Sequence, residues 1–165
     1  MIVKGENLMV FVGEGATATS IAYATSHSLN INLSTTETSN KDQGHGEWQT
    51  YEGGVMSWDC SSDNLVGDEN SHGKTYTDMV DLMLSKTPVS LVFGINKPNT
   101  AEPTTEENGT LNEAPTTGWT ANDAKVPYYS GKALITSISL NAPNGDNASY
   151  TVSFQGCGGL KKKTK

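Results

Sequence analysis

Histidine and carboxylate residues are the first candidates for chemistry in this chain, and none of them forms a recognisable metal-binding pattern. His45 lies in a Gly-His-Gly sequence beside Asp42 and Glu47, which offers three conceivable metal ligands. A closed metal site needs three or four converging ligands, and a solvated loop histidine explains the pattern more simply. The other histidines, His27 and His72, have no partner at ligand spacing. We therefore predict no bound metal ion.

Two further motifs resemble ligand-binding loops but are incomplete. The acidic segment 63–70 lacks the position-6 glycine and position-12 glutamate of an EF-hand calcium loop. Gly13 and Gly15 follow an apolar run, yet no third glycine completes a dinucleotide fingerprint. Since no nucleophile, acid–base pair or phosphate-binding loop is recognisable either, we predict that the protein is not an enzyme and uses no cofactor.

The charge distribution argues against a nucleic-acid-binding protein. The 165 residues carry 18 acidic and 11 basic side chains, and none of the basic ones is arginine. Four lysines lie in the last five positions, so residues 1–160 carry 7 lysines against 18 acids, a net charge of −11. Such a surface cannot bind phosphates by releasing counterions, and arginine, the commonest reader of guanine, is missing. We expect this body to repel nucleic acid.

Aromatic side chains are the remaining candidates for a functional site. Trp58 lies within an apolar run and is expected in the core. Trp48 and Trp119 stand in polar segments, where each either anchors a protein–protein interface or folds back onto its own domain. Together with Tyr128 and Tyr129, they are the predicted subunit or ring interface residues.

The elements that must position these residues are mostly strands. Apolar residues run continuously or alternate in eight segments, which predicts as many strands: 8–12, 21–24, 29–33, 48–51, 55–60, 89–93, 134–140 and 148–154. Gly53-Gly54 separates two of them, and 34–47 is expected to be a polar loop or protruding hairpin. The segment 63–73 is expected to be a polar turn. A turn at 141–147 containing Asn144-Gly145 joins the last two strands as a hairpin.

One helix interrupts this pattern. Five apolar residues between 76 and 84 recur at helical spacing, Thr75 fits the N-cap position, and Pro88 stops the helix. This predicts a helix over about 75–86. The polar stretch 96–130 lacks periodicity and is predicted to be a long loop.

The predicted fold is therefore mainly β, an antiparallel sandwich or barrel-like pair of sheets with one flanking helix. A single domain spans 1–160, and a basic, flexible tail spans 161–165. The two cysteines, Cys60 and Cys157, lie far apart and are predicted to be separate thiols, although a disulfide between them is the alternative.

The closing segment carries a resemblance to a known family. Residues 131–158 read GKALITSISLNAPNGDNASYTVSFQGCG and resemble the end of bacteriophage major tail proteins, the tail tube proteins of long-tailed phages. Residues 7–12 and 21–29 resemble the family's first hairpin and third strand. Trp58, the segment 63–65 and the predicted helix resemble its middle. The resemblance covers nearly the whole chain except about 96–127.

The resemblance implies a structural virion protein whose copies form hexameric rings that stack into a hollow tube for DNA. Its partners would be itself and other tail proteins, with no membrane and with DNA only as repelled cargo. It would be located in the virion tail after assembly in the host cytoplasm. The predicted lumen-facing acids are Glu37, Asp42, Glu47 and Glu52. The long loop is expected to contact the adjacent subunit or ring, so a chain lacking 98–124 should fold but form no long tubes.

Two alternatives stay open at this point. Tube proteins of type VI secretion are similar in fold, so the chain could instead belong to a secretion or contractile injection system. A carbohydrate-binding or adhesin-like β-sandwich module is an alternative of another class, in which exposed tryptophans would stack on sugar rings.

Overall fold

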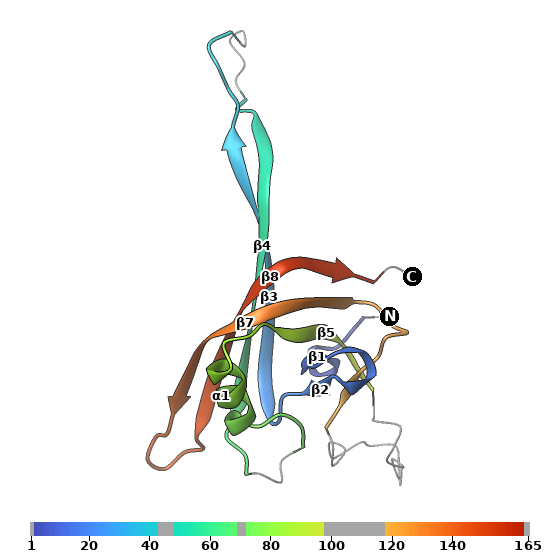
Figure 1. Ribbon diagram of the computed structural model, residues 1–165, viewed down its shortest axis with the longest axis vertical. Coiled ribbons are helices and arrows are strands. Elements are labelled where there is room, and N and C mark those ends of the chain that lie inside the picture. Colours follow the sequence, from blue (N-terminus) through green and yellow to red (C-terminus); the bar gives the residue numbers. More distant parts are fainter. Residues whose placement is uncertain (1, 43–47, 69–71, 98–117, 164–165) are drawn as a thin grey trace.

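The computed structural model describes residues 2–42, 48–68, 72–97 and 118–163, and strands make up most of them. Five strands are long: β3 (Ala24–Glu37), β4 (Tyr51–Leu65), β5 (Val89–Lys97), β7 (Tyr128–Asn141) and β8 (Ser149–Lys162). The others are β1 (Leu8–Val12) and the two-residue strands β2 (Thr19–Ser20) and β6 (Thr120–Ala121). Short 3-10 turns cover Gly5–Asn7 and Gly15–Thr17, and the helix α1 covers Tyr76–Leu84. The predicted mainly β fold with one helix is confirmed (Figure 1).

The strands form one antiparallel sheet in the order β1-β2-β6-β5-β7-β8-β4-β3. Because β1 also pairs with β5, the strands β1, β2, β6 and β5 close into a small barrel at one end of the sheet. At the other end β3 pairs with β4 alone among the described strands. The sheet is therefore closed at one end and open at the other.

The main core lies where β4, β7 and β8 pack against β1, β5 and α1. Its side chains are those that alternate toward this side of each strand: Val10, Trp58, Cys60, Met79, Leu91, Ala133, Tyr150, Val152 and Phe154. A smaller core of Phe11, Ala18, Val92 and Ala121 fills the small barrel. Most of these residues lie in the predicted apolar runs and alternating segments, whereas Ala18 and Ala121 lie outside them.

The helix α1 forms as its sequence predicts. The Thr75 hydroxyl accepts a hydrogen bond from the Asp78 backbone, and the Asp78 carboxylate accepts one from the Thr75 backbone at 2.9 Å, which completes a capping box. Met79 is fully buried against the sheet. The Tyr76 ring meets the Tyr150 ring edge-on, with ring centres 5.2 Å apart. This packing holds α1 on the core side of the sheet.

The Gly53-Gly54 pair does not separate two strands, so this prediction was wrong. β4 runs through both glycines, and its pairing shifts between Leu33, opposite Met56, and Thr35, opposite Gly53. β4 therefore carries one extra residue here, a β-bulge. A side chain at Gly54 would lie 2.5 Å from the Ser34 hydroxyl oxygen, so the glycine permits the close pairing.

The long strands β3, β4, β5, β7 and β8 all extend beyond their predicted ranges, as β4 and β8 illustrate. β4 continues to Leu65, so the polar turn predicted for 63–73 starts later. β8 continues to Lys162, with Lys161 paired to Ser130 and Lys162 paired to Tyr129. The domain boundary drawn at residue 160 therefore falls inside a strand. The polar residues of both segments do not by themselves indicate a strand. They form one because a neighbouring strand supplies the hydrogen bonds.

The predicted loop 96–130 contains part of the small barrel. Lys97 at the end of β5 pairs with Thr120 of β6, and Thr120 in turn pairs with β2. A deletion of 98–124 would remove β6 together with Trp119, so we revise the expectation that such a chain keeps its fold. Residues 98–117 lie outside the described part of the chain.

Candidate functional surfaces

The sheet formed by β3, β4, β8 and β7 has one face in the core and an opposite face that is almost entirely polar. Side chains alternate between the two faces along each strand, so the register defines the rows across the exposed face. The rows are Ser26–Asp63–Thr151–Ser139, Ser28–Ser61–Ser153–Ser137 and Asn30–Asp59–Gln155–Leu134. We call these residues the polar face. Leu134 is its one apolar member.

Two aspartates carry the charge of the polar face. The Asp59 carboxylate accepts hydrogen bonds from the side-chain amides of Asn30, at 2.8 Å, and Asn32, at 3.3 Å. The Asp63 carboxylate accepts from the hydroxyls of Ser26, at 3.1 Å, and Thr151, at 2.7 Å. Each carboxylate is thus held in place at the surface by neutral donors.

Sequence analysis did not identify Asp59 and Asp63 as site residues. The sequence pattern that could have identified them is the period of two in the segment 57–63. Trp58 and Cys60 point to the core, and the residues between and beside them point away. The predicted acids Glu37, Asp42 and Glu52 are exposed and lie earlier in the chain, in a projecting hairpin. Glu47 lies outside the described residues.

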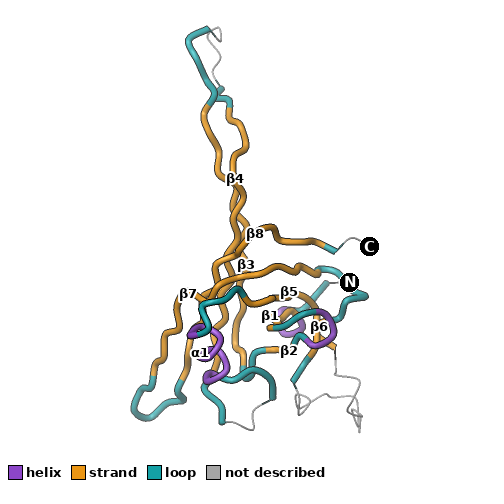
Figure 2. The backbone as a smooth tube through the Cα atoms, viewed as in Figure 1, coloured by secondary structure: helices purple, strands orange, loops and turns teal. Residues whose placement is uncertain are grey.

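This projecting hairpin, which we call the arm, consists of residues 31–42 and 48–58. β4 pairs with β8 only from Asp59 onward, so along the arm β3 and β4 pair with each other alone. Figures 1 and 2 show the arm as a two-stranded ribbon that extends far beyond the rest of the sheet. Of the two possibilities expected for 34–47, a polar loop or a protruding hairpin, the structure has the hairpin, and its strands are longer than expected.

One side of the arm is apolar and uncovered. The exposed fractions are 49% for Ile31, 55% for Leu33 and 66% for Met56. Ile31 and Leu33 continue the alternation that buries Leu29 in the main core. The apolar face of the sheet therefore continues beyond the core onto the arm, where no other described element covers it.

The predicted interface aromatics lie in separate regions. Trp48 is 85% exposed near the tip of the arm. Trp119 instead packs on the core of the small barrel, and its backbone N–H donates to the Ser20 hydroxyl at 3.0 Å, which fits the alternative that it folds back onto its own domain. Tyr128 packs beside it, and burial together with the charge of Asp123 raises the pKa of its hydroxyl. An interface role of these aromatics stays a prediction.

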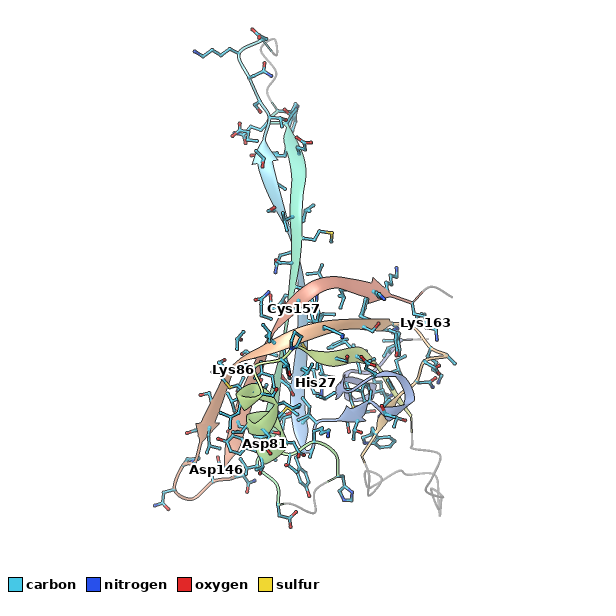
Figure 3. All side chains as sticks on the ribbon, viewed as in Figure 1. His27, Asp81, Lys86, Asp146, Cys157 and Lys163 are labelled. Carbon is cyan, nitrogen blue, oxygen red and sulfur yellow. The ribbon has the colours of Figure 1, made fainter. Side chains whose placement is uncertain are left out.

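The buried titratable groups do not form a chemical site. His27, labelled in Figure 3, lies on the core side of β3. Its Nδ1 atom is buried without a hydrogen-bond partner among the described residues. Burial lowers the pKa of His27 to about 4, although the charge of Asp63 acts in the opposite direction. Burial raises the pKa of the Cys60 thiol to about 12. Cys60 and Cys157 are both free, as predicted.

Neither a metal site nor a membrane span is present among the described residues. No three side chains of histidine, cysteine, aspartate or glutamate there lie close enough together to hold a metal ion. No helix in the described ranges is both long and apolar enough to cross a bilayer.

Comparison with known proteins identifies the fold. The chain matches no family model and no curated protein sequence. Two solved structures, the tail of an empty gene transfer agent (GTA) particle with C6 symmetry and the virion of the native GTA particle, each superpose with a TM-score of 0.68 at 17% identity. Both matches cover 99% of this chain and 100% of the other. The SPP1 tail tube superposes with a TM-score of 0.57 at 9% identity, covering 99% of this chain and 81% of the other.

The chain has a tail tube fold. The resemblance predicted from residues 131–158 is thereby confirmed at the level of the fold. That tail tube fold includes the arm, since the match extends over 99% of the chain.

Proposed function

We propose that this protein is a structural subunit that assembles with its own copies into a tail tube. The main support for this proposal is the arm, whose apolar side is uncovered in a single copy of the protein. The chain also shares its fold with subunits of tail tubes. An isolated two-stranded ribbon is only marginally stable in water, and an exposed sheet edge invites pairing with another chain. A second copy that covers the arm would satisfy both requirements.

The likeness to assembled tails supports a ring as the unit of assembly. A head-to-tail contact between identical subunits closes into a ring when the rotation between them fits. The GTA tail that shares the fold has C6 symmetry, so we propose six subunits per ring and stacked rings. The location would be the tail of a virion assembled in the host cytoplasm, with other tail proteins as further partners. A secretion or contractile injection tube would use the same assembly.

We place the polar face toward the lumen, where DNA would pass. Its hydroxyl and amide groups are neutral, and Asp59 and Asp63 are its only charged members among the described residues. Fixed carboxylates repel DNA phosphates, and these three rows contain no lysine that would retain them, although Lys132 follows two residues beyond Leu134 on the same face. A map of the assembled tube in which lysines dominate the lumen surface would overturn this placement.

The assembly proposal is tested by making the apolar side of the arm polar. Leu33→Asn with Met56→Ser changes two paired residues on that side, and Asn32→Thr with Ser57→Thr is the matched control on the opposite side. The wild type is studied by electron microscopy at high concentration and when fused to a hexameric carrier, which raises its local concentration. We expect rings or tubes from the wild type and the control only.

Because the altered side chains are exposed, both variants should keep the wild-type unfolding midpoint. Normal tubes from Leu33→Asn with Met56→Ser, or a wild type that never assembles even on the carrier, would contradict the proposal.

A further inference from the structure

The described residues distribute their charge unequally between the two ends of the long sheet. The segments 24–42 and 48–65, which form β3, β4 and the arm, carry five acids and one lysine, a net charge of −4. The segments 122–132 and 156–163, which lie where β7 and β8 point away from the arm, carry five lysines and one aspartate, a net charge of +4. We call them the acidic flank and the basic end. Figure 1 shows that the arm and this end of β7 and β8 project from the sheet in different directions.

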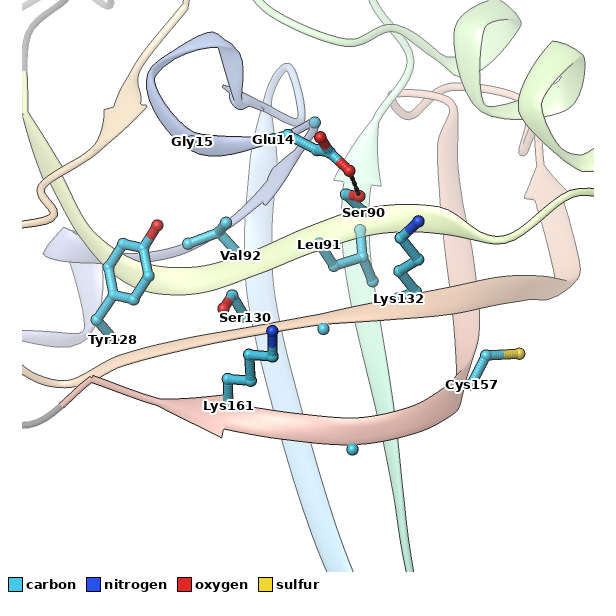
Figure 4. Close-up of a pocket in the computed structure, with 13 residues that line it drawn as sticks. Glu14, Gly15, Ser90, Leu91, Val92, Tyr128, Ser130, Lys132, Cys157 and Lys161 are labelled. Atoms are coloured by element: carbon cyan, nitrogen blue, oxygen red, sulfur yellow. Dashed lines mark hydrogen bonds between the residues drawn. The ribbon is translucent and has the colours of Figure 1, made fainter.

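The basic end contains a groove of about 410 Å³ beside the small barrel. Lys132 from β7 and Lys161 from β8 line it together with Tyr128 and Ser130, and their side chains rise on the same side of the sheet (Figure 4). Glu14 lies across the groove, where its carboxylate accepts a hydrogen bond from Ser90 at 2.9 Å. Including Glu14, the basic end keeps a net charge of +3.

The two lysines of the groove are not paired with a carboxylate among the described residues. Among the described residues, neither Lys132 nor Lys161 forms an ion pair, whereas Lys163 pairs with Asp123 at 3.8 Å. The groove thus presents two exposed ammonium groups above a floor of strand backbone and small side chains.

The arm offers the opposite charge on a narrow ribbon. Glu52 lies opposite Thr36 and Glu37 lies opposite Tyr51, so the two carboxylates are on opposite sides of a ribbon only two strands wide. Both are exposed and form no ion pair with the described residues. Beyond Gln155, β8 pairs with β7 alone among the described strands, so its free edge borders the groove and is open to a further strand.

We propose that the arm of one copy binds the basic end of the next copy, with Glu37 and Glu52 paired to Lys132 and Lys161 of the second copy. This inference rests on the proposed function and specifies its contact. The two complementary surfaces lie at different ends of one chain, so the contact is head-to-tail and leaves a free arm and a free groove for further copies. Reversing a subunit would bring like charges together, which disfavours the wrong arrangement.

The charges and the apolar side of the arm contribute differently to this contact. Exposed ion pairs act mainly on the association rate and on orientation, and salt screens them. The uncovered apolar residues of the arm provide the affinity through their burial. Covering Lys132 and Lys161 would also remove the lysines nearest to the polar face.

Charge exchange tests the contact. The arm variant carries Glu37→Lys with Glu52→Lys, and the groove variant carries Lys132→Glu with Lys161→Glu. Each alone places like charges at every contact and should assemble at least about tenfold less, measured by sedimentation in low salt, where the Coulomb repulsion is strongest. An equal mixture of the two, or a single chain with all four changes, has opposite charges at the contact again and should recover assembly.

The controls separate the contact from folding and from the proposed function. All variants should keep the wild-type circular dichroism and denaturation midpoint, since the changed residues are exposed. If the wild type assembles but the single variants do so equally well, or if neither the mixture nor the fourfold variant recovers, the charge pairing is overturned while tube assembly stands. Tubes that survive the Leu33→Asn and Met56→Ser change would overturn the proposed function itself.

Discussion

The Trp58 indole nitrogen donates a hydrogen bond to the backbone carbonyl oxygen of Gly158, at a distance of 3.0 Å, where the arm leaves the sheet. Trp58 belongs to β4 and Gly158 to β8, and the pairing of these strands ends at Asp59. The indole ring lies over Gly156 and Gly131, which leave room for it because they have no side chains. The root of the arm is therefore fixed by one tryptophan on two neighbouring strands.

We expect Gly156→Ala to destabilise the protein by about 1–3 kcal/mol, because the added methyl group would overlap the buried indole ring. The free energy of unfolding in urea measures the effect. Gly159→Ala is the matched control on the same strand, since nothing lies within 4 Å of its added methyl group. The control should change the stability by less than about 0.5 kcal/mol. Equal stabilities for both variants would show that the indole ring does not require the space.

The elements with local signals could be predicted from the sequence. Thr75, Asp78 and the apolar stripe define α1, and Asn144-Gly145 defines the closing turn. The elements that were predicted wrongly depend on partners distant in the chain. Gly53-Gly54 is compatible with a strand only because β3 pairs beside its bulge, and Lys161 belongs to a strand only because β7 continues to Tyr128.

The functional surfaces were harder to predict than the fold, because they depend on register. A shift of one residue along β4 would exchange Asp59 with Trp58 or Cys60 between the core and the exposed face. The sequence predicts Glu37 and Glu52 for the lumen because they lie in the loop and strands near the first sheet, whereas the rows across four strands place Asp59 and Asp63 on the polar face. Trp119 could not be assigned from its polar neighbours, since β2 and β6 bring it to the small barrel.

The segment 98–117 should be removable, whereas 98–124 should not be. Lys97 and Thr120 are paired, so a short Gly-Ser linker can join residue 97 to residue 118. The longer deletion also removes Trp119 and the buried Ala121 from the small barrel, and the loss of such buried apolar side chains costs about 2–5 kcal/mol. We expect a near wild-type unfolding midpoint for the first deletion and a strongly lowered one for the second.

The two deletions also test the predicted role of the long segment in assembly. If the shorter deletion folds but gives no tubes, the segment contributes to a contact between subunits or rings. If it gives normal tubes, that role is excluded. A longer deletion that is as stable as the wild type would show that β6 is dispensable for the fold.

The last prediction concerns the stability of the protein in acid. His27 has a pKa of about 4 in the folded protein because it is buried, against an ordinary value of 6.5. Between these values the unfolded chain takes up a proton that the folded protein does not, so folding stability falls as the pH falls from about 6.5 to about 4. The loss of folding stability attributable to His27 is on the order of 3 kcal/mol.

His27→Leu tests this prediction, because it removes the titrating group and places an apolar side chain at this position. Urea unfolding of both proteins from about pH 7 to about pH 4 should show that the free energy of unfolding of the wild type falls by about 3 kcal/mol relative to that of the variant, because carboxylates contribute alike to both and the wild type alone loses the His27 contribution. Parallel curves for the two proteins would mean that His27 is accessible to protons in the folded state, contrary to the burial of its imidazole between β3 and the amino-terminal segment.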